Sequence, residues 1–211
     1  LGATEQHGPH LPLATDTIIA EAWAVGVAER IEGAVAAPAL PYGSSGEHQS
    51  FAGTLSIGGP ALHHVAVELA RSASPGFTRL DFLSGHAGND GTLREVVDQL
   101  RHEGHDAIHL VPTWSTERFG PIDAHAGRVE TSLLLHLRPD LVRLDEAEPG
   151  AVEPLSELLA DLVRGGVGAV SANGVLGDPS GSTAEEGRRL LDDLIDRTVE
   201  RLDRPEPPAS G

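Results

Sequence analysis

Hydrophobic positions in the first forty residues change from helical spacing to a short continuous run. Over residues 16–32 the apolar side chains recur every three or four positions, which is the spacing of one helix face. They are Ile18, Ile19, Ala22, Trp23, Val27 and Ile31. Gly33 ends this pattern, and the apolar run at residues 34–40 follows it. The pattern predicts a helix followed by a buried strand.

The same alternation continues towards the C-terminus. Apolar runs predict strands at residues 77–83, 107–112 and 167–171, and helical spacing predicts helices at 61–71, 92–101, 129–137 and 183–202. Residues 144–154, rich in Glu and Pro, predict an exposed connection. Strands alternating with helices favour a layered α/β/α domain around a mainly parallel central sheet. We expect one domain over residues 1–203 and a flexible tail at 204–211.

The amino-acid composition excludes several kinds of active site and binding partner. The chain of 211 residues has no Cys, which excludes disulfides, thiolate metal sites and a cysteine nucleophile. Its 15 basic and 32 acidic residues give a net charge of -17, so nucleic acid is not an expected partner. No apolar run approaches the roughly 18 residues that span a bilayer, and we expect no membrane contact and a cytoplasmic location. We also expect that the strand leading into the first motif is absent.

The first motif is EQHGPHLP at residues 5–12, followed by Asp16. Glu5 and His7 are two positions apart, so an extended backbone would direct both side chains to the same face. Asp16 falls in the first turn of the predicted helix, where its carboxylate would lie beside them. The three side chains suit a metal site. The alternative is a polar loop whose Thr15 or Asp16 caps the helix.

Two further segments at the ends of apolar runs carry unusual polar residues. His86 follows the strand at 77–83, and Gly85 and Gly88 on either side of it let the backbone approach a ligand. His125 and Glu130 precede the helix at 129–137. The alternatives are an ordinary turn between strand and helix for the first segment and a favourable first-turn carboxylate for Glu130.

Together these segments supply five oxygen or nitrogen donors, enough for two divalent cations that share one carboxylate. The donors are Glu5, His7, Asp16, His86 and Glu130. Zn²⁺, Mn²⁺ and Fe²⁺ all suit such a set, and the spacing does not choose among them. His125 remains as a titratable group that could carry a proton to or from a leaving amine.

The three segments resemble the signatures of the creatininase family, in the same order and over nearly the whole chain. They are EQHGPHLP with Asp16, the turn GHAGN at residues 85–89, and HAGRVETS at residues 125–132. The resemblance implies a layered α/β amidohydrolase with a two-metal site. It implies that Glu5 and His86 bind one ion, that His7 and Glu130 bind the other, and that Asp16 bridges them. It also implies that His125 is the catalytic histidine.

Within that family, the stretch VSANGVLGDP at residues 170–179, leading to EEG at 185–187, is similar to members that act in mycofactocin maturation. Those members are peptidases that release a C-terminal dipeptide from a modified precursor peptide. Creatininase proper has a glutamate where this chain has Gly88, which implies that Glu130 takes over the ligand role. Ser84 stands where the family usually has Asn.

Other interpretations of the sequence stay open. One is a cyclic-amide or formamide hydrolase on the same site, acting on a small amide. Another is an inactive metal-binding assembly subunit. The resemblance also implies a homo-oligomer, and specifically a hexamer. His10, His48 and Asn89 are candidate substrate contacts, because they lie in the motifs or in a glycine- and serine-rich loop, where a plain structural role is the alternative.

A serine hydrolase is disfavoured, because the serines at residues 43–46 lack the glycine pattern of a nucleophile elbow. A phosphate-binding loop is excluded too, because the glycine cluster at residues 85–91 contains no Lys.

Overall fold

The computed structural model describes residues 1–203, and the predicted tail at 204–211 lies outside this range. Its longer helices are α1 (Thr15–Ala28), α2 (Gly58–Ala73), α3 (Asp90–His102), α5 (Arg128–Leu137), α6 (Leu155–Gly165) and α7 (Ala184–Leu202). Shorter helices are α4 (Thr116–Phe119), η1 (Gly46–His48), η2 (Ala87–Asn89), η3 (Pro139–Leu141), η4 (Leu144–Glu146) and η5 (Val167–Ala169). Within this range no helix is both long and apolar enough to cross a bilayer.

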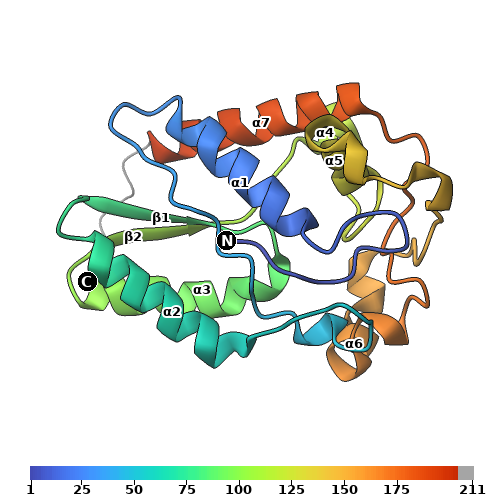
Figure 1. The fold of residues 1–211 in the computed structure, drawn as a ribbon, viewed down its shortest axis with the longest axis horizontal. Helices are drawn as coiled ribbons and strands as arrows, with labels where there is room; N and C mark the ends of the chain where they lie inside the picture. The colour runs from blue at the N-terminus through green and yellow to red at the C-terminus, as the bar shows by residue number, and fades with distance from the viewer. Residues whose placement is uncertain (204–211) are drawn as a thin grey trace.

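The strands β1 (Arg79–Leu83) and β2 (Asp106–Leu110) pair in parallel, with Leu83 opposite Leu110. Helices α1 and α7 lie on one side of this sheet, and α2 and α3 lie on the other (Figure 1). Each side has its own apolar core, because successive strand residues point to opposite faces. The result is a layered α/β/α arrangement.

The two cores divide the strand residues between them. Leu83, Ile108 and Leu110 pack in the cluster that contains α1, α5 and α7. Ala107 packs with α2 and α3, and the partly buried Leu80 and Phe82 join it there. The alternation therefore continues across both strands, and their carboxyl ends open towards the polar motifs.

Two predicted strands are wrong. Residues 34–40 form no strand: Val35 is 70% exposed, and Pro38 has no N–H to donate to a ladder. Residues 167–171 contain the short helix η5 instead. A Cβ on Gly166 would lie 2.5 Å from the carbonyl oxygen of Glu47, and one on Gly168 would lie 2.6 Å from Ser50 Oγ. The glycines therefore let this segment pack against the loop at 47–50 and not in a ladder.

The other predicted elements are confirmed to within four residues at their ends. The largest difference is in the first helix, which ends at Ala28 and not at residue 32. The segment 144–154 is mostly exposed as expected. Helix α6 was not expected. Residues 1–7 run past the carboxyl end of β1, where Gly85 N–H donates to the carbonyl oxygen of Leu1 at 2.9 Å. Thr4 forms an isolated antiparallel bridge with Leu55. This path carries the first motif to the start of α1.

Candidate metal centre

The five predicted metal ligands come together from four segments of the chain. Glu5 and His7 leave the extended run after residue 4, Asp16 lies in the first turn of α1, His86 follows β1, and Glu130 lies in the first turn of α5. Their ligand atoms form two groups in which all members lie within 4.8 Å of one another. The groups are Glu5, Asp16 and His86, and His7, Asp16 and Glu130.

Asp16 belongs to both groups and directs one oxygen to each. Its Oδ1 lies 3.0 Å from His7 Nε2, and its Oδ2 lies 3.5 Å from His86 Nδ1. Its carboxylate does not cap α1, because the N-cap residue is Ala14 and no side chain caps that helix end. Asp16 therefore lies between the two groups, in a position from which its carboxylate could serve both.

Glu5 and Glu130 occupy the outer ends of the two groups. Glu5 Oε1 lies 3.2 Å from His86 Nδ1, and Glu130 Oε2 lies 3.8 Å from His7 Nε2. Glu130 Oε2 also accepts a hydrogen bond from the Ala126 N–H at 2.6 Å, so this carboxylate fixes the start of α5 as well as facing the site.

Buried carboxylate oxygens without hydrogen-bond partners show that this donor set suits cations. Both oxygens of Glu5 and Oδ2 of Asp16 are in this position. Glu5 is fully buried and Asp16 is 1% exposed. Burying unpaired charge costs several kcal/mol per group, so carboxylates in such places are paired or bind a metal. The residues therefore fit two divalent cations.

The protonation of the ligands reflects the strength of this negative cluster. Burial alone would lower the pKa of His7, but the adjacent Asp16 carboxylate raises it to about 10. Burial would also lower the pKa of His86, but the Glu5 and Asp16 carboxylates raise it to about 9. Burial raises the pKa of Glu130 to about 7. The cluster of carboxylates attracts positive charge. Where no metal is bound, the protonated His7 and His86 supply this charge.

Gln6 sets the orientation of two more histidines. Its Nε2 lies 2.9 Å from His48 Nδ1, 3.0 Å from the Gly174 carbonyl oxygen and 3.1 Å from His125 Nε2, but it has only two hydrogens. His125 Nε2 is also 2.8 Å from the carbonyl oxygen of Gln6. The backbone carbonyl of Gln6 can only accept, so His125 Nε2 donates to it, and Gln6 donates its two hydrogens to His48 and Gly174. The 3.1 Å approach of Gln6 Nε2 to His125 Nε2 is then not a hydrogen bond.

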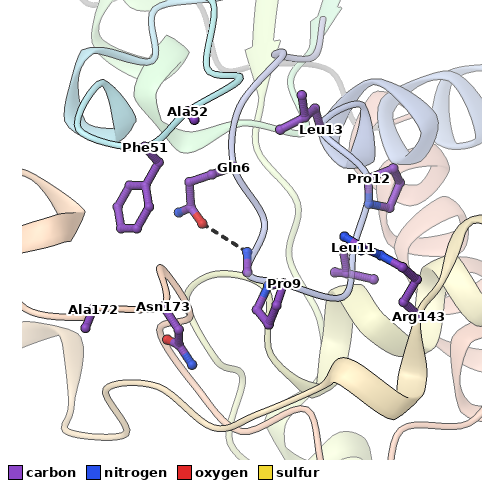
Figure 2. A pocket seen from close by; sticks show the side chains of 11 residues that line it. Gln6, Pro9, Leu11, Pro12, Leu13, Phe51, Ala52, Arg143, Ala172 and Asn173 are labelled. Atoms are coloured by element: carbon purple, nitrogen blue, oxygen red, sulfur yellow. Dashed lines mark hydrogen bonds between the residues drawn. The ribbon is translucent and has the colours of Figure 1, made fainter.

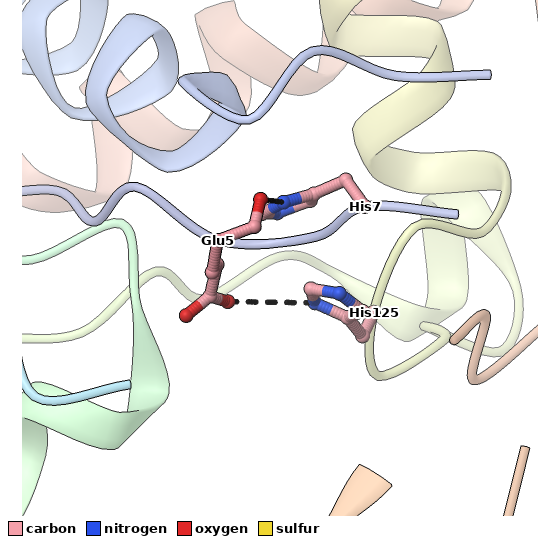
Figure 3. Close-up of side chains that lie close together, drawn as sticks. All are labelled: Glu5, His7 and His125. Carbon is pink, nitrogen blue, oxygen red and sulfur yellow. Dashed lines mark hydrogen bonds and ion pairs between the residues drawn. The ribbon is translucent and has the colours of Figure 1, made fainter. Parts of the chain in front are cut away.

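That assignment leaves His125 Nδ1 free to accept a proton. Nδ1 faces the metal centre, 3.9 Å from Glu5 Oε1 (Figure 3). Burial, followed by the charges of His7 and His48, lowers the pKa of His125 well below its ordinary value. The ring is therefore neutral at physiological pH, with its unprotonated nitrogen towards the place where a cation-bound substrate would lie.

The three candidate substrate contacts lie in buried, supporting positions. His48 is 4% exposed, and its Nε2 lies 3.2 Å from Glu5 Oε1. His10 Nε2 contacts Thr131 Oγ1 at 2.9 Å. The Asn89 amide bonds the Ser44 N–H, the Gly2 carbonyl and Ser84 Oγ. Their side chains hold the surrounding loops together, which favours the structural alternative for all three.

Glu47 is a neighbour of the site that the sequence did not single out. Its Oε1 lies 3.4 Å from His86 Nε2, which also lies 3.0 Å from the Ser44 carbonyl oxygen. These partners direct Nδ1 of His86 towards Glu5 and Asp16, which is the usual way that a histidine ligand is oriented. A Cβ on Gly88 would lie 2.3 Å from Glu47 Oε1 and from His86 Nε2. The space for a side chain at position 88 is therefore already filled.

Comparisons with known proteins identify the family of the chain. The family described as "Creatininase: Creatinine amidohydrolase" matches residues 1–202. A "Mycofactocin precursor peptide peptidase" of Mycobacterium ulcerans (strain Agy99) is 50% identical over 100% of this chain and 86% of its own length. The "Creatinine amidohydrolase" of Pseudomonas putida is 30% identical over 99% of this chain and 88% of its own.

Solved structures give the same result. "Creatininase Mn" aligns with a TM-score of 0.81 and 29% identity over 95% of this chain and 87% of its own. A creatininase mutant of the "Zn-Zn type" aligns with a TM-score of 0.77 and 28% identity, over 95% and 86%. The fold and the matches define a hydrolase of amide bonds. The chain belongs to the creatininase family.

Proposed function

We propose that this chain is a peptidase that removes a C-terminal dipeptide from the modified precursor peptide of the mycofactocin system. The support is the relative of that name, which is 50% identical over the full chain. The stretch at residues 170–179, which resembles the mycofactocin branch, contacts two residues of the site. In it, Leu176 forms a bridge with His125, and Gly174 accepts a hydrogen bond from Gln6.

We further propose that the site is dinuclear, with Zn, Fe or Mn as the metal. The observation that carries this proposal is the pair of donor groups that share Asp16. Glu5 and His86 would hold one cation, His7 and Glu130 the other, and Asp16 both. When bound, two such cations would lower the pKa of a water molecule and polarise the scissile amide carbonyl.

The role of His125 follows from its free Nδ1. As a neutral base that faces the site, it can accept a proton from the attacking water and then deliver it to the leaving amine. Gln6 keeps the ring in place, because its backbone carbonyl accepts the hydrogen bond from Nε2. Burial keeps bulk water away from the imidazole, so the proton stays available for the amine.

A homo-oligomer, specifically a hexamer, is part of this proposal. It is supported by an exposed apolar stripe on α6, in which Leu155, Leu159 and Val163 are 48%, 54% and 81% exposed. These residues are four apart and so share one helix face. An apolar face of this kind is typical of contacts between protein chains.

A second candidate function is hydrolysis of a small cyclic amide or formamide, which the 30% identical creatinine amidohydrolase favours. The same donor groups would serve that reaction. An inactive metal-binding assembly subunit would keep the same ligands without turnover.

Metal analysis combined with one cleavage assay tests these proposals. The purified protein should carry two metal ions per chain and release Val-Tyr from a peptide that ends in Val-Tyr, and creatinine should be a poor substrate. Two ions without turnover of peptide or creatinine would favour the inactive subunit. Turnover of creatinine alone would favour the second candidate.

Replacing His125 with Ala separates proton transfer from metal binding. We expect His125→Ala to retain both ions and to lose at least ~100-fold in kcat, because a positioned general acid or base contributes about that much. If the variant instead loses metal, His125 is a ligand, and the proposed proton transfer is wrong.

A further inference from the structure

A cavity of about 440 Å³ opens beside the first motif, and none of the five proposed metal ligands lines it. Its walls come from three parts of the chain: the motif itself at Gln6, Pro9 and Leu13, the loop at Phe51, and the segment at Asn173 (Figure 2). Arg143 completes the lining. Most of this surface is apolar, as in sites for small ligands and peptide side chains.

Gln6 joins this cavity to the metal centre. Its side chain lines the cavity, and its backbone carbonyl accepts the hydrogen bond from His125 Nε2 at 2.8 Å. Glu5 and His7, on either side of it in the sequence, face the cation positions. A substrate whose scissile bond lies at the cations therefore has the cavity as its neighbouring space.

Arg143 is the only charged side chain among the described residues that line the cavity. Its backbone N–H donates to the carbonyl oxygen of His10 at 2.9 Å, which fixes its base to the first motif. Its guanidinium pairs with Glu146 at 3.1 Å, but both side chains are about half exposed. An exposed pair of this kind contributes little, so a better-placed carboxylate can replace Glu146.

The two other polar side chains of the lining, Gln6 and Asn173, already have hydrogen-bond partners. Gln6 Nε2 contacts His48 and the Gly174 carbonyl oxygen, and its Oε1 accepts from the Gly8 N–H. Asn173 Oδ1 accepts hydrogen bonds from Ser171 Oγ and the Val175 N–H, and its Nδ2 donates to the Pro149 carbonyl oxygen. Arg143 is therefore the cavity's available strong donor. A guanidinium can bind a carboxylate through two parallel hydrogen bonds.

We propose that this cavity binds the C-terminal dipeptide of the substrate and that Arg143 binds its terminal carboxylate. This inference rests on the proposed function, because only a peptidase acting near a C-terminus meets that group. In a chain of net charge -17 a carboxylate is repelled unless a cation is present where it binds. The apolar wall with Phe51 suits the side chains of a Val-Tyr end.

The test compares two substrates and two variants. The substrates are a synthetic peptide that ends in Val-Tyr with a free carboxylate and the same peptide with a C-terminal carboxamide. The variants are Arg143→Gln and the matched control Arg138→Gln. Arg138 lies five residues earlier, forms an exposed pair with Asp140 at 2.8 Å, and does not line the cavity. Metal content and circular dichroism check that each variant folds and stays loaded.

We expect the unmodified enzyme to prefer the free acid to the carboxamide by about 10- to 100-fold in kcat/KM, which is the size of one charge-assisted pair of hydrogen bonds. Arg143→Gln should lose that preference through a higher KM, with kcat and metal content nearly unchanged, and Arg143→Lys should regain part of it. Arg138→Gln should keep the preference. Inhibition by free Val-Tyr should weaken by a similar factor in Arg143→Gln only.

Three results would overturn the inference while leaving the proposed function intact. They are equal cleavage of acid and carboxamide by the unmodified enzyme, an unchanged preference in Arg143→Gln, and an equal loss on both substrates in that variant. If the unmodified enzyme carries two ions and cleaves neither peptide, the proposed peptidase function itself is wrong, and this inference is wrong with it.

Discussion

At the scale of single residues, Asp16 is the side chain that the two donor groups share. Its two oxygens face His7 and His86, and the carboxylate is 1% exposed. Glu5 and Glu130 each belong to one of these two groups only. Loss of Asp16 therefore has a different consequence from loss of either glutamate.

We expect Asp16→Ala to empty both cation positions, and Glu130→Gln to empty only the one that it shares with His7. The reason is that Asp16 supplies a charged ligand to both groups, and removing one ligand from a three-residue group weakens binding by orders of magnitude. Metal analysis of dialysed protein measures the number of ions per chain. Two ions retained by Asp16→Ala would show that it does not bridge.

That Glu5, His7, Asp16, His86 and Glu130 come together could be predicted from the sequence, because each lies in a short motif with recognisable spacing. The supporting residues could not. Gln6 acts on His125, which is 119 positions away, and Glu47 acts on His86 across the site. Such contacts depend on how the loops meet in space, and neither residue has a spacing that distinguishes it from an ordinary polar loop residue.

At the scale of elements, α5 and α7 approach each other closely at Gly187. A Cβ at this position would lie 1.8 Å from the carbonyl oxygen of Ser132, so the two helices can pack at this distance only if residue 187 has no side chain. Glu186, next to it, accepts hydrogen bonds from Arg128 and from Ser132 Oγ. This contact fixes the first turn of α5, which carries Glu130.

We expect Gly187→Ala to lower the free energy of unfolding by about 1–3 kcal/mol or more, because backbone must move to make room. Gly91→Ala is the matched control. It is also helical, a Cβ there meets nothing within 4 Å, and it should gain about 0.5–1 kcal/mol from helix propensity. Urea unfolding of both variants at one metal concentration measures the difference. Equal effects of the two would contradict the close approach.

Helical spacing predicted the elements that bury one face, such as α1 and α7, because burial and periodicity then agree. Helical spacing could not distinguish a strand from a loop or a short helix at residues 34–40 and 167–171, where apolar composition alone suggested strands. There the outcome was decided by Pro38 and by glycines that pack against another loop, and such contacts leave no periodic trace in the sequence.

At the scale of the whole molecule, metal binding and protonation are coupled. His7 and His86 have pKa values of about 10 and about 9 in the metal-free chain, so both carry protons at pH 7.5. Metal ligands must be deprotonated. In the metal-free chain the same raised pKa values stabilise the folded state below about pH 6.5, and this contribution is lost as the pH rises through 9 to 10.

We expect metal binding at pH 7.5 to release about two protons per chain, and the apparent affinity to increase with pH until it levels off near pH 10. Titration calorimetry in buffers with different heats of protonation measures the number released. The His125→Ala variant is the control, because removing the His125 imidazole should leave the number of released protons unchanged. Proton uptake, or no exchange at all, would contradict the raised pKa values.

The extended run at residues 5–7 has a consequence for how enzymes of this kind can diverge. Its outer members, Glu5 and His7, belong to the proposed metal centre, and Gln6 between them lines the cavity and accepts the hydrogen bond from His125. A mutation at Gln6 would change the surroundings of His125 and the cavity wall together, whereas Leu13, Phe51 and Arg143 line the cavity and belong to neither donor group. New substrate preferences should therefore evolve through those three positions first, with Gln6 the last to change.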